Sequence, residues 1–293
     1  MRVTDSQVFA RLSGRVAAAW ERLARLQDQA ATGRRVNRPS DDPAAAARIG
    51  ALDEFLARLR DCQDGAHQAQ AWLEGAESAL ASASDTLIRA RELAVQGASE
   101  QYSPADRAAL AAEAQELYQQ LLASSNAQVA GRYLFAGFQE DAPAFDSTGT
   151  YQGDDGELWL EVSPGLRVAA NLPGDRVFSG AGGGVDLFAT LDGLRAALAA
   201  DDSVAIRASL SGLEQGLEQL NAARAELGTR YNTVSFAQEG NSALRVSSES
   251  DRGRLGDADW AQLTSELATA ERALQAALAT FPMLQSMSLL ARR

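Results

Sequence analysis

An unbroken seven-residue repeat of apolar side chains constrains this chain more than any other feature. Seven positions from Leu52 to Ala94 follow one another at intervals of seven, and a second apolar or small residue lies three positions after each, from Phe55 to Gly97. A strict seven-residue repeat keeps one stripe of a helix against a partner and imposes a left-handed supercoil. The repeat predicts a helix over about 44–99, roughly 84 Å long at 1.5 Å per residue. Such a helix needs other helices beside it.

Two further helices are predicted within the chain. Ser103 followed by Pro104 is typical of an N-cap and a first helical position, and apolar residues continue from Leu110 to Leu121. A third stripe runs from Ile206 to Val234 on heptad positions, with Arg224 as its only interruption. These segments supply the partners that the long helix requires.

Both ends of the chain carry amphipathic stripes with alternating spacings of three and four. Neither end has a folded domain of its own, so the stripes are expected to pair with each other or with neighbouring molecules. We therefore predict terminal coiled-coil assembly segments over residues 1–40 and 255–293. The predicted interface residues are Phe9, Leu12, Val16, Leu23, Leu26, Trp260, Leu263, Leu267, Leu274, Phe281 and Leu284.

Two features qualify these terminal segments. Pro282 lies inside the C-terminal stripe, where a proline removes a backbone hydrogen bond, so we expect a continuous helix only over about 257–280, with a bend or a second short helix after it. Residues 1–40 carry eight arginines and three acidic residues, a local charge of +5. This excess is consistent with an acidic partner or with a solvated helix face.

The middle of the chain breaks the helical pattern. The stretch "ELWLEVSPGLRVAANL" alternates apolar residues around a turn at Ser163 to Gly165, which predicts a hairpin. "YLFAGF" and "DRVFSG" add strand-like pieces, and the glycine run at 180–184 lacks the spacing of a phosphate-binding loop. The predicted fold class is mainly α: a long antiparallel helical rod or coiled-coil bundle built from both chain ends, with helical residues 41–131 and 186–254 and a small β-rich module inserted at 132–185.

The stretch "TGRRVNRPSDDPAAAARIG", residues 32–50, combines signals that stop one helix and start another. Glycine tolerates the left-handed conformation that ends a helix, and a carboxylate before a proline favours the start of the next one. Asp41 and Asp42 are both candidates for that cap, and a metal site at the two aspartates is the rival interpretation, without a third nearby ligand. The predicted turn and helix-restart motif consists of Gly33, Arg34, Arg35, Asn37, Asp41, Asp42 and Pro43.

Composition limits the function classes. A formal net charge of -12 argues against nucleic acid as a partner, because phosphates require a basic surface. The single cysteine allows no internal disulfide, no apolar run is long enough to span a membrane, and no cleavable signal is visible. Cys62 falls on the apolar seam and His67 beside it, where a buried small residue and a solvent-facing histidine are favoured over catalytic roles. No enzyme activity, metal or cofactor is expected.

The segment "SGRVAAAWERLARLQDQAATGRRVNRPSDDPAAAARI" closely resembles the N-terminal signature of the flagellin-like family. "ADRAALAAEAQELYQQLLASSNAQVAGRYLFAGF", "YQGDDGE", "NLPGDRVF" and "LGDADWAQLTSELATAERALQAALAT" are similar to the branch known as hook-associated protein 3, the hook-filament junction proteins. The resemblance implies an extracellular structural protein of the bacterial flagellum that forms a ring. The implied partners are hook-associated protein 1, flagellin, an export chaperone and the flagellar export apparatus, which secretes such proteins without a cleavable signal.

Three alternatives remain open at this stage. Flagellin itself belongs to the same family and polymerises into long filaments. An enzyme needs convergent polar groups of matched pKa, which the sequence does not indicate. An intracellular coiled-coil scaffold leaves the β-rich insertion and the turn motif unexplained.

Overall fold

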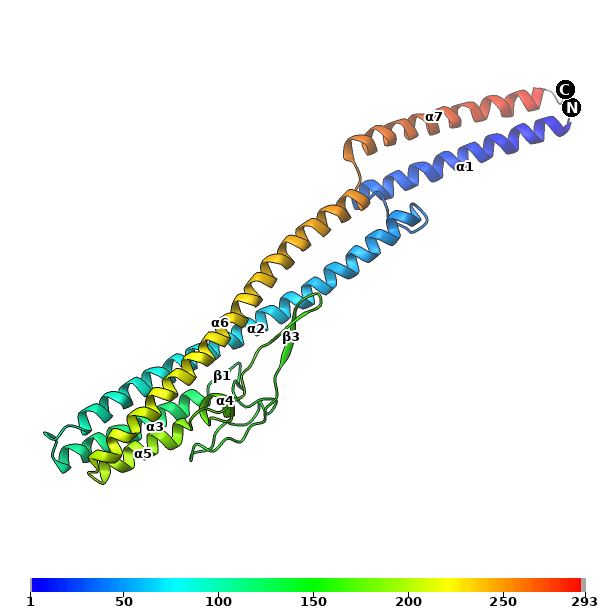
Figure 1. Ribbon diagram of the computed structural model, residues 1–293. Helices are drawn as coiled ribbons and strands as arrows, with labels where there is room; N and C mark the ends of the chain where they lie inside the picture. Colours follow the sequence, from blue (N-terminus) through cyan, green and yellow to red (C-terminus); the bar gives the residue numbers. More distant parts are fainter. Residues whose placement is uncertain (1, 291–293) are drawn as a thin grey trace. The chain divides into compact units, whose positions relative to one another are not determined.

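The structure, a computed structural model, describes the backbone of residues 2–290 and the side chains of residue 7 and residues 10–279. The chain divides into two compact units, residues 58–243 and residues 1–57 with 244–293. Figure 1 shows the order of the elements along the chain. The helices are α1 (Arg2–Thr32), α2 (Pro43–Gly97), α3 (Pro104–Ser125), α4 (Gly174–Phe178), α5 (Leu187–Ala199), α6 (Ser203–Gly256) and α7 (Trp260–Leu290), and the strands are β1 (Gln128–Val129), β2 (Arg132–Tyr133), β3 (Trp159–Ser163) and β4 (Leu166–Ala169). The predicted fold class, mainly α with a small β-rich insertion, is confirmed.

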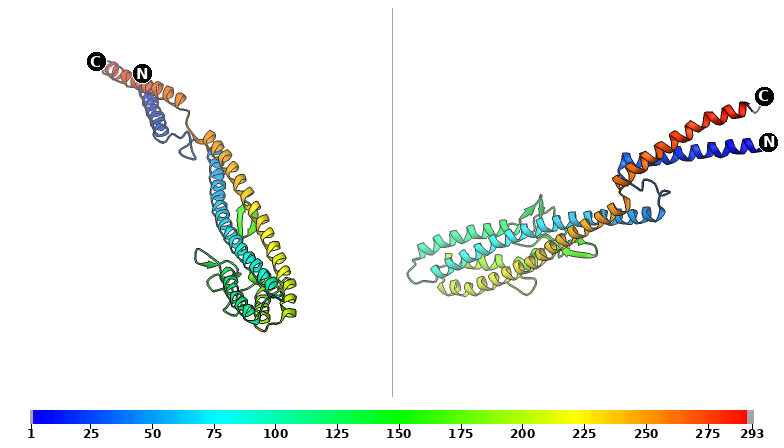
Figure 2. Two further views of the ribbon diagram at one scale, coloured as in Figure 1. Left: turned by 90° about the vertical axis from the view of Figure 1, so that its left-hand side faces the viewer. Right: turned by 90° about the horizontal axis from the view of Figure 1, so that it is seen from above.

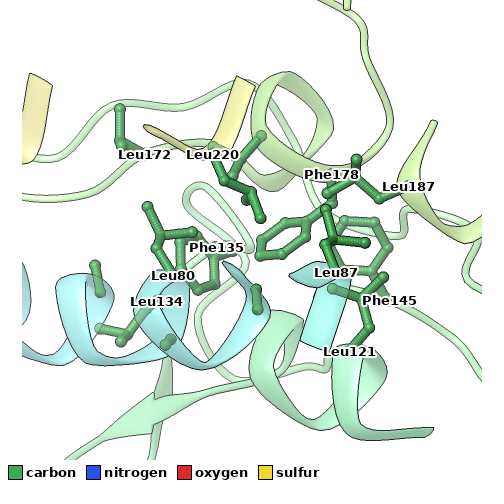
Figure 3. Packing of buried hydrophobic residues seen from close by; sticks show 14 of the residues in the cluster. Leu80, Leu87, Leu121, Leu134, Phe135, Phe145, Leu172, Phe178, Leu187 and Leu220 are labelled. Carbon is green, nitrogen blue, oxygen red and sulfur yellow. The ribbon is translucent and has the colours of Figure 1, made fainter. Parts of the chain in front are cut away.

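The unit 58–243 is a helical bundle with one hydrophobic core. Its portions of α2 and α6 pack with α3 and α5, as both views in Figure 2 show. The heptad repeat of α2 faces this core: Leu73, Leu80 and Leu87 are all buried, as the sequence predicts. Figure 3 shows Leu80 and Leu87 beside side chains from the inserted module.

Two arginines within the bundle form ion pairs with acidic side chains. Arg107 is buried near the start of α3, where its guanidinium donates to the carbonyl oxygens of Gly97 (2.7 Å) and Ser99 (2.9 Å) and pairs with Asp201. The interruption that Arg224 makes in the α6 stripe is accommodated by an ion pair with Glu77 on α2, at 2.6 Å. Each charge therefore has a partner, which the buried Arg107 requires because an unpaired charge is costly to bury.

The predicted cap of α3 is present. The Ser103 hydroxyl accepts from the backbone N–H of Asp106, the Asp106 side chain accepts from the backbone N–H of Ser103, and Pro104 is the first helical residue. This reciprocal pair satisfies two of the unpaired N–H groups at the helix start. The capping box explains why α3 begins directly after the turn that ends α2.

The described strands of the β-rich region form two separate hairpins, β1–β2 and β3–β4. β3 pairs antiparallel with β4 around the turn predicted from "SPG", where Gly165 has a φ of +81°, so the hairpin prediction is confirmed. Two other predictions were wrong. Only Tyr133 of "YLFAGF" lies in a strand, and "DRVFSG" contributes to helix α4. Phe135 and Phe178 from these segments pack in the core with their rings 5.2 Å apart, and this tertiary packing overrides local strand preference.

The β3–β4 hairpin is fixed to both long helices. On α6, the buried Asn241 donates to the carbonyl oxygen of Val162 (2.8 Å) and accepts from the Ser163 hydroxyl (2.9 Å). On α2, a Cβ added to Gly65 would lie 2.6 Å from the Glu161 carbonyl oxygen, and Arg58 pairs with the Glu161 carboxylate at 3.2 Å. A glycine is needed at position 65 because the hairpin backbone approaches the helix so closely.

In the other unit, α1 and α7 lie side by side in antiparallel directions, with the start of α1 beside the end of α7 (Figure 1). Helix α7 continues through Pro282 to Leu290, so the expected interruption after residue 280 was wrong. A proline removes one N–H donor and disturbs one turn, while the backbone hydrogen bonds before and after it can maintain a helix. Among the described residues, no helix is both long enough and apolar enough to cross a membrane.

Candidate assembly interface

The two chain ends share an apolar seam of their own. Leu23 and Leu26 on α1 are packed against Leu263 and Leu274 on α7, and each of the four side chains is at most 6% exposed. Fully burying a leucine contributes about 1.5–3 kcal/mol. Burial of these side chains therefore stabilises the pairing of α1 with α7.

The remaining predicted interface residues occupy more exposed positions. Val16 and Leu267 are partly buried at the borders of the seam, and Leu12 is half-buried. Trp260, at the start of α7, is 56% exposed. The side chains of Phe9, Phe281 and Leu284 lie outside the described residues.

The turn between α1 and α2 is closed by its two aspartates, which have different tasks. Asp42 Oδ1 accepts from the Ala45 backbone N–H (3.0 Å) and so caps α2, which begins at Pro43. Asp41 Oδ2 instead accepts from the backbone N–H groups of Asn37 (3.1 Å) and Arg38 (2.8 Å). The structure therefore separates the two candidates that the sequence left open.

The turn starts where helix α1 ends, at a glycine in the left-handed conformation. Helix α1 ends at Thr32, and Gly33 adopts a φ of +69° while its N–H donates to the Gln29 carbonyl oxygen at 2.9 Å. The Thr32 hydroxyl donates to the Asn37 side-chain oxygen at 2.8 Å, across the turn. A glycine suits position 33 because other residues adopt this left-handed conformation at a cost.

The turn also contacts the segment between α6 and α7, and this contact was not predicted from the sequence. The Arg35 N–H donates to the Gly256 carbonyl oxygen (2.7 Å), the Ala258 N–H donates to the Gly33 carbonyl oxygen (3.0 Å), and Arg34 and Asp257 form an antiparallel bridge. The two segments through which the chain enters and leaves the α1–α7 pair are therefore joined. No local sequence signal predicts this bridge, because it joins residues more than 200 positions apart.

Cys62 and His67, the residues whose side-chain types most often act in catalysis, lie in ordinary packing and surface environments. Cys62 is buried, and burial and the nearby Glu161 carboxylate raise the pKa of its thiol. His67 is exposed, with Nδ1 3.3 Å from the Gln238 side-chain nitrogen. Within the described part of the chain, no group of three His, Cys, Asp or Glu residues could hold a metal ion.

Comparison with known proteins places these features in a family. Residues 10–140 match the family model described as the bacterial flagellin N-terminal helical region. The chain is 28% identical to flagellar hook-associated protein 3 of Salmonella typhimurium over 99% of this chain and 98% of that protein. It is 30% identical to flagellar hook-associated protein 3 of Escherichia coli, covering 89% of this chain and 90% of that protein.

A solved structure shares the fold. The crystal structure of flagellar hook-associated protein 3 from Legionella pneumophila matches with a TM-score of 0.63 and 18% identity, covering 71% of this chain and 98% of that one. The likeness extends over most of both chains, as the sequence relationship does. The chain therefore belongs to the family of flagellar hook-associated protein 3, within the flagellin-like proteins.

Proposed function

We propose that this chain is a structural subunit of the junction between the hook and the filament of the bacterial flagellum, and that it assembles through the α1–α7 pair. The observation that carries the proposal is the apolar seam between the two chain ends, found in a chain of this family. Helices with a seam of this kind present further surface for contact with neighbouring subunits.

The partners follow from the proposed place in the flagellum. We propose that one side of a ring of these subunits contacts hook-associated protein 1 and that the other contacts the first flagellin subunits. The chain would reach this extracellular position through the flagellar export apparatus, and an export chaperone would cover α7 beforehand. These steps suit an α7 seam whose side chains need cover whenever α1 is absent.

The proposed role is structural rather than catalytic. Cys62 and His67, the residues with the most reactive side chains, serve as a buried core residue and a surface hydrogen-bonding residue. We propose that the predicted segments have separate roles. Residues 1–40 and 255–293 would serve assembly, residues 41–131 and 186–254 would form the supporting helices, and residues 132–185 would add a surface module.

A deletion strain of the source bacterium tests the proposal. Loss of the chain should leave hooks intact, release flagellin into the medium and abolish motility, and plasmid-borne chain should restore filaments. Antibody labelling should place the chain at the filament base. Normal filaments in the deletion strain would contradict the proposal.

The alternative within the family is that the chain is a flagellin, and a polymerisation assay distinguishes the two functions. A junction subunit should not form long filaments by itself, whereas flagellin should. Purified chain seeded with filament fragments and viewed by electron microscopy distinguishes the two. Long filaments of this chain alone would favour the flagellin assignment.

A further inference from the structure

The α1–α7 pair has two chemically different flanks. On α1, Arg22 lies one residue before the seam residue Leu23, a rotation of about 100° to one side. On α7, Glu266 lies three residues after Leu263, about 60° in the same sense. The two helices are antiparallel, so equal rotations fall on the same side, and the contact between Arg22 and Glu266 at 3.8 Å agrees with this placement. We name this side the arginine flank.

The arginine flank continues along α1. Arg11 and Arg15 precede Arg22 at spacings of eleven and seven, which places all three guanidinium groups in one row. Arg11 and Arg15 are exposed, and in the part of the chain that the structure describes no hydrogen bond or ion pair involves either side chain. Arg11 and Arg15 therefore carry positive charge that no described residue compensates, whereas Arg22 is paired with Glu266.

The opposite side of the pair carries the large exposed apolar residues, and we name it the tryptophan flank. Trp20 and Trp260 each lie three residues before a seam residue, Leu23 and Leu263, which is a rotation in the sense opposite to Arg22. Leu278 lies eighteen residues after Trp260, in the same row. Trp20 is 54% exposed, Trp260 56% and Leu278 46%. Among the described residues, three large apolar side chains thus line one side of the two-helix pair.

A single carboxylate accompanies the tryptophans. Glu271 lies eleven residues after Trp260, which is about three complete turns, and its side chain is exposed. Among the described residues it has no hydrogen-bonding or ion-pair partner. The tryptophan flank therefore combines two indole faces with one unpaired negative charge.

We propose that the tryptophan flank of one subunit docks on the arginine flank of a second copy of this chain. Arg11 and Arg15 would stack on the exposed indoles and pair with Glu271, because guanidinium groups are favoured over tryptophan faces and beside carboxylates. Complementary charge on the two flanks identifies the occupant, since each side supplies what the other lacks. This inference rests on the proposed function, because it specifies how neighbouring subunits meet.

The arrangement has a consequence for symmetry. Contact between two different patches is heterologous and generates a ring when the rotation closes, whereas contact of a patch with itself stops at a dimer. A subunit with two complementary flanks can bind one neighbour on each side. The proposed contact is therefore of the kind that a ring requires.

Cysteine cross-linking tests the contact without altering the residues that make it. Ser13 lies in the row of Trp20, seven residues before it, and Ala273 lies on the arginine flank of α7; both are small and exposed. In a Cys62→Ala background, chains with Ser13→Cys and Ala273→Cys would be produced with different tags in one deletion strain. Isolated hook-filament preparations would then be treated with a short bismaleimide. Arg272→Cys, on the exposed back of α7, replaces Ala273→Cys as the matched control.

A cross-linked dimer carrying both tags is expected from the mixture of Ser13→Cys and Ala273→Cys, and none from either variant alone. Adding Trp20→Glu to the Ser13→Cys chain should abolish the cross-link. Dimers from Ser13→Cys alone, equal dimers with Arg272→Cys, or no dimers in strains that retain their filaments would overturn the proposed contact and leave the junction function intact. Absence of every variant and of the unmodified chain from the filament base would overturn both.

Discussion

Nη1 of Arg35 lies 3.1 Å from Oδ2 of Asp42, across the turn that joins α1 to α2. Nη2 of the same guanidinium donates to the carbonyl oxygen of Leu255, at 2.7 Å, near the end of α6. One side chain therefore connects the cap of α2 with the segment that leads to α7. The relationship gives Arg35 a different task from its neighbour Arg34, although the sequence presents them as a pair.

Replacing Arg35 with alanine should destabilise the unit that contains α1 and α7. The substitution removes a hydrogen bond to a carbonyl and an ion pair with Asp42, and a charged hydrogen bond contributes about 1.5–3 kcal/mol. Since the Arg35 side chain is 46% exposed and solvent screens its charge, we expect less than this range, about 1 kcal/mol. Urea unfolding measures the change. Arg34→Ala is the control, because among the described residues the Arg34 side chain makes no hydrogen bond or ion pair, and an equal loss in both variants would contradict the assigned roles.

The Asp42 carboxylate should make the start of α2 sensitive to acid. The Ala45 N–H and the Arg35 guanidinium lower the pKa of Asp42 below its usual 3.8. A group whose pKa is lowered on folding stabilises the fold above its unfolded pKa, and that stabilisation is lost as the pH falls through the folded value. The contribution should therefore be complete above about pH 5 and decline below about pH 4.

The variant Asp42→Asn isolates this effect, because asparagine also caps helices but does not titrate. The difference in free energy of unfolding between the parent chain and the variant should shrink between pH 6 and pH 3, measured by urea unfolding. Glu54→Gln, at an exposed position of α2 where no described residue pairs with the carboxylate, is a control for general acid effects. A difference that stays constant over this range would show that the charge of Asp42 does not contribute.

The sequence predicted the helices well because their signals are local or periodic. The heptad repeat placed Leu73 and Leu80 in the core, and Ser103 marked the start of α3. The secondary structure around Phe178 was not predictable in this way. Its short segment forms a helix, and the ring packs in an aromatic cluster with Phe135 and Phe145 from other segments. Pro282 misled the prediction in the opposite way: a proline locally disfavours a helix, yet α7 continues through it to Leu290.

The contacts that hold separate segments together could not be predicted from spacing. Asn241 appears in the sequence as one more polar residue in a long helix, yet it is buried against the backbone of β3. Gly65 similarly gives no sign that a hairpin crosses α2 at that position. Of the candidate interface, the seam followed from periodicity, whereas the bridge between Arg34 and Asp257 depends on long-range pairing.

Leu80→Ala should destabilise the bundle by about 2–5 kcal/mol, because it leaves a cavity in a packed core. Leu80 is fully buried in a cluster that also contains Phe135 and Phe178 from the inserted module. The bundle and the module should therefore unfold in a single transition at a lower temperature, visible by circular dichroism. Ile88→Ala, at a position that is 42% exposed on the same helix, should change stability far less. An unchanged melting temperature for Leu80→Ala would contradict the assigned core face.

Asn241→Ala should loosen the β3–β4 hairpin. The substitution leaves the Val162 carbonyl oxygen and the Ser163 hydroxyl without their partner, and an unsatisfied buried group costs about 1–3 kcal/mol. Amide hydrogen exchange in β3 and β4 should accelerate more than exchange in α3. Asn232→Ala, on the exposed side of α6, is the matched control. Uniform acceleration throughout the unit would indicate global destabilisation instead of local release.

Leu274→Asp should separate the α1–α7 pair and abolish assembly at the hook tip. Leu274 is 6% exposed and packs in the seam with Leu23 and Leu26, where an aspartate would bury a charge without a partner. The unit 58–243 should remain folded because its core is a separate cluster.

Gln275→Asp introduces the same charge at the adjacent exposed position and should be tolerated. Removal of residues 289–293, beyond the described seam, should also do less harm than Leu274→Asp. Motility and filament retention in a complemented deletion strain measure all three variants, with circular dichroism of the purified chains as the check on folding. If the five-residue deletion abolished assembly while Leu274→Asp was tolerated, the seam between Leu23, Leu26 and Leu274 would not be what holds the subunit in place.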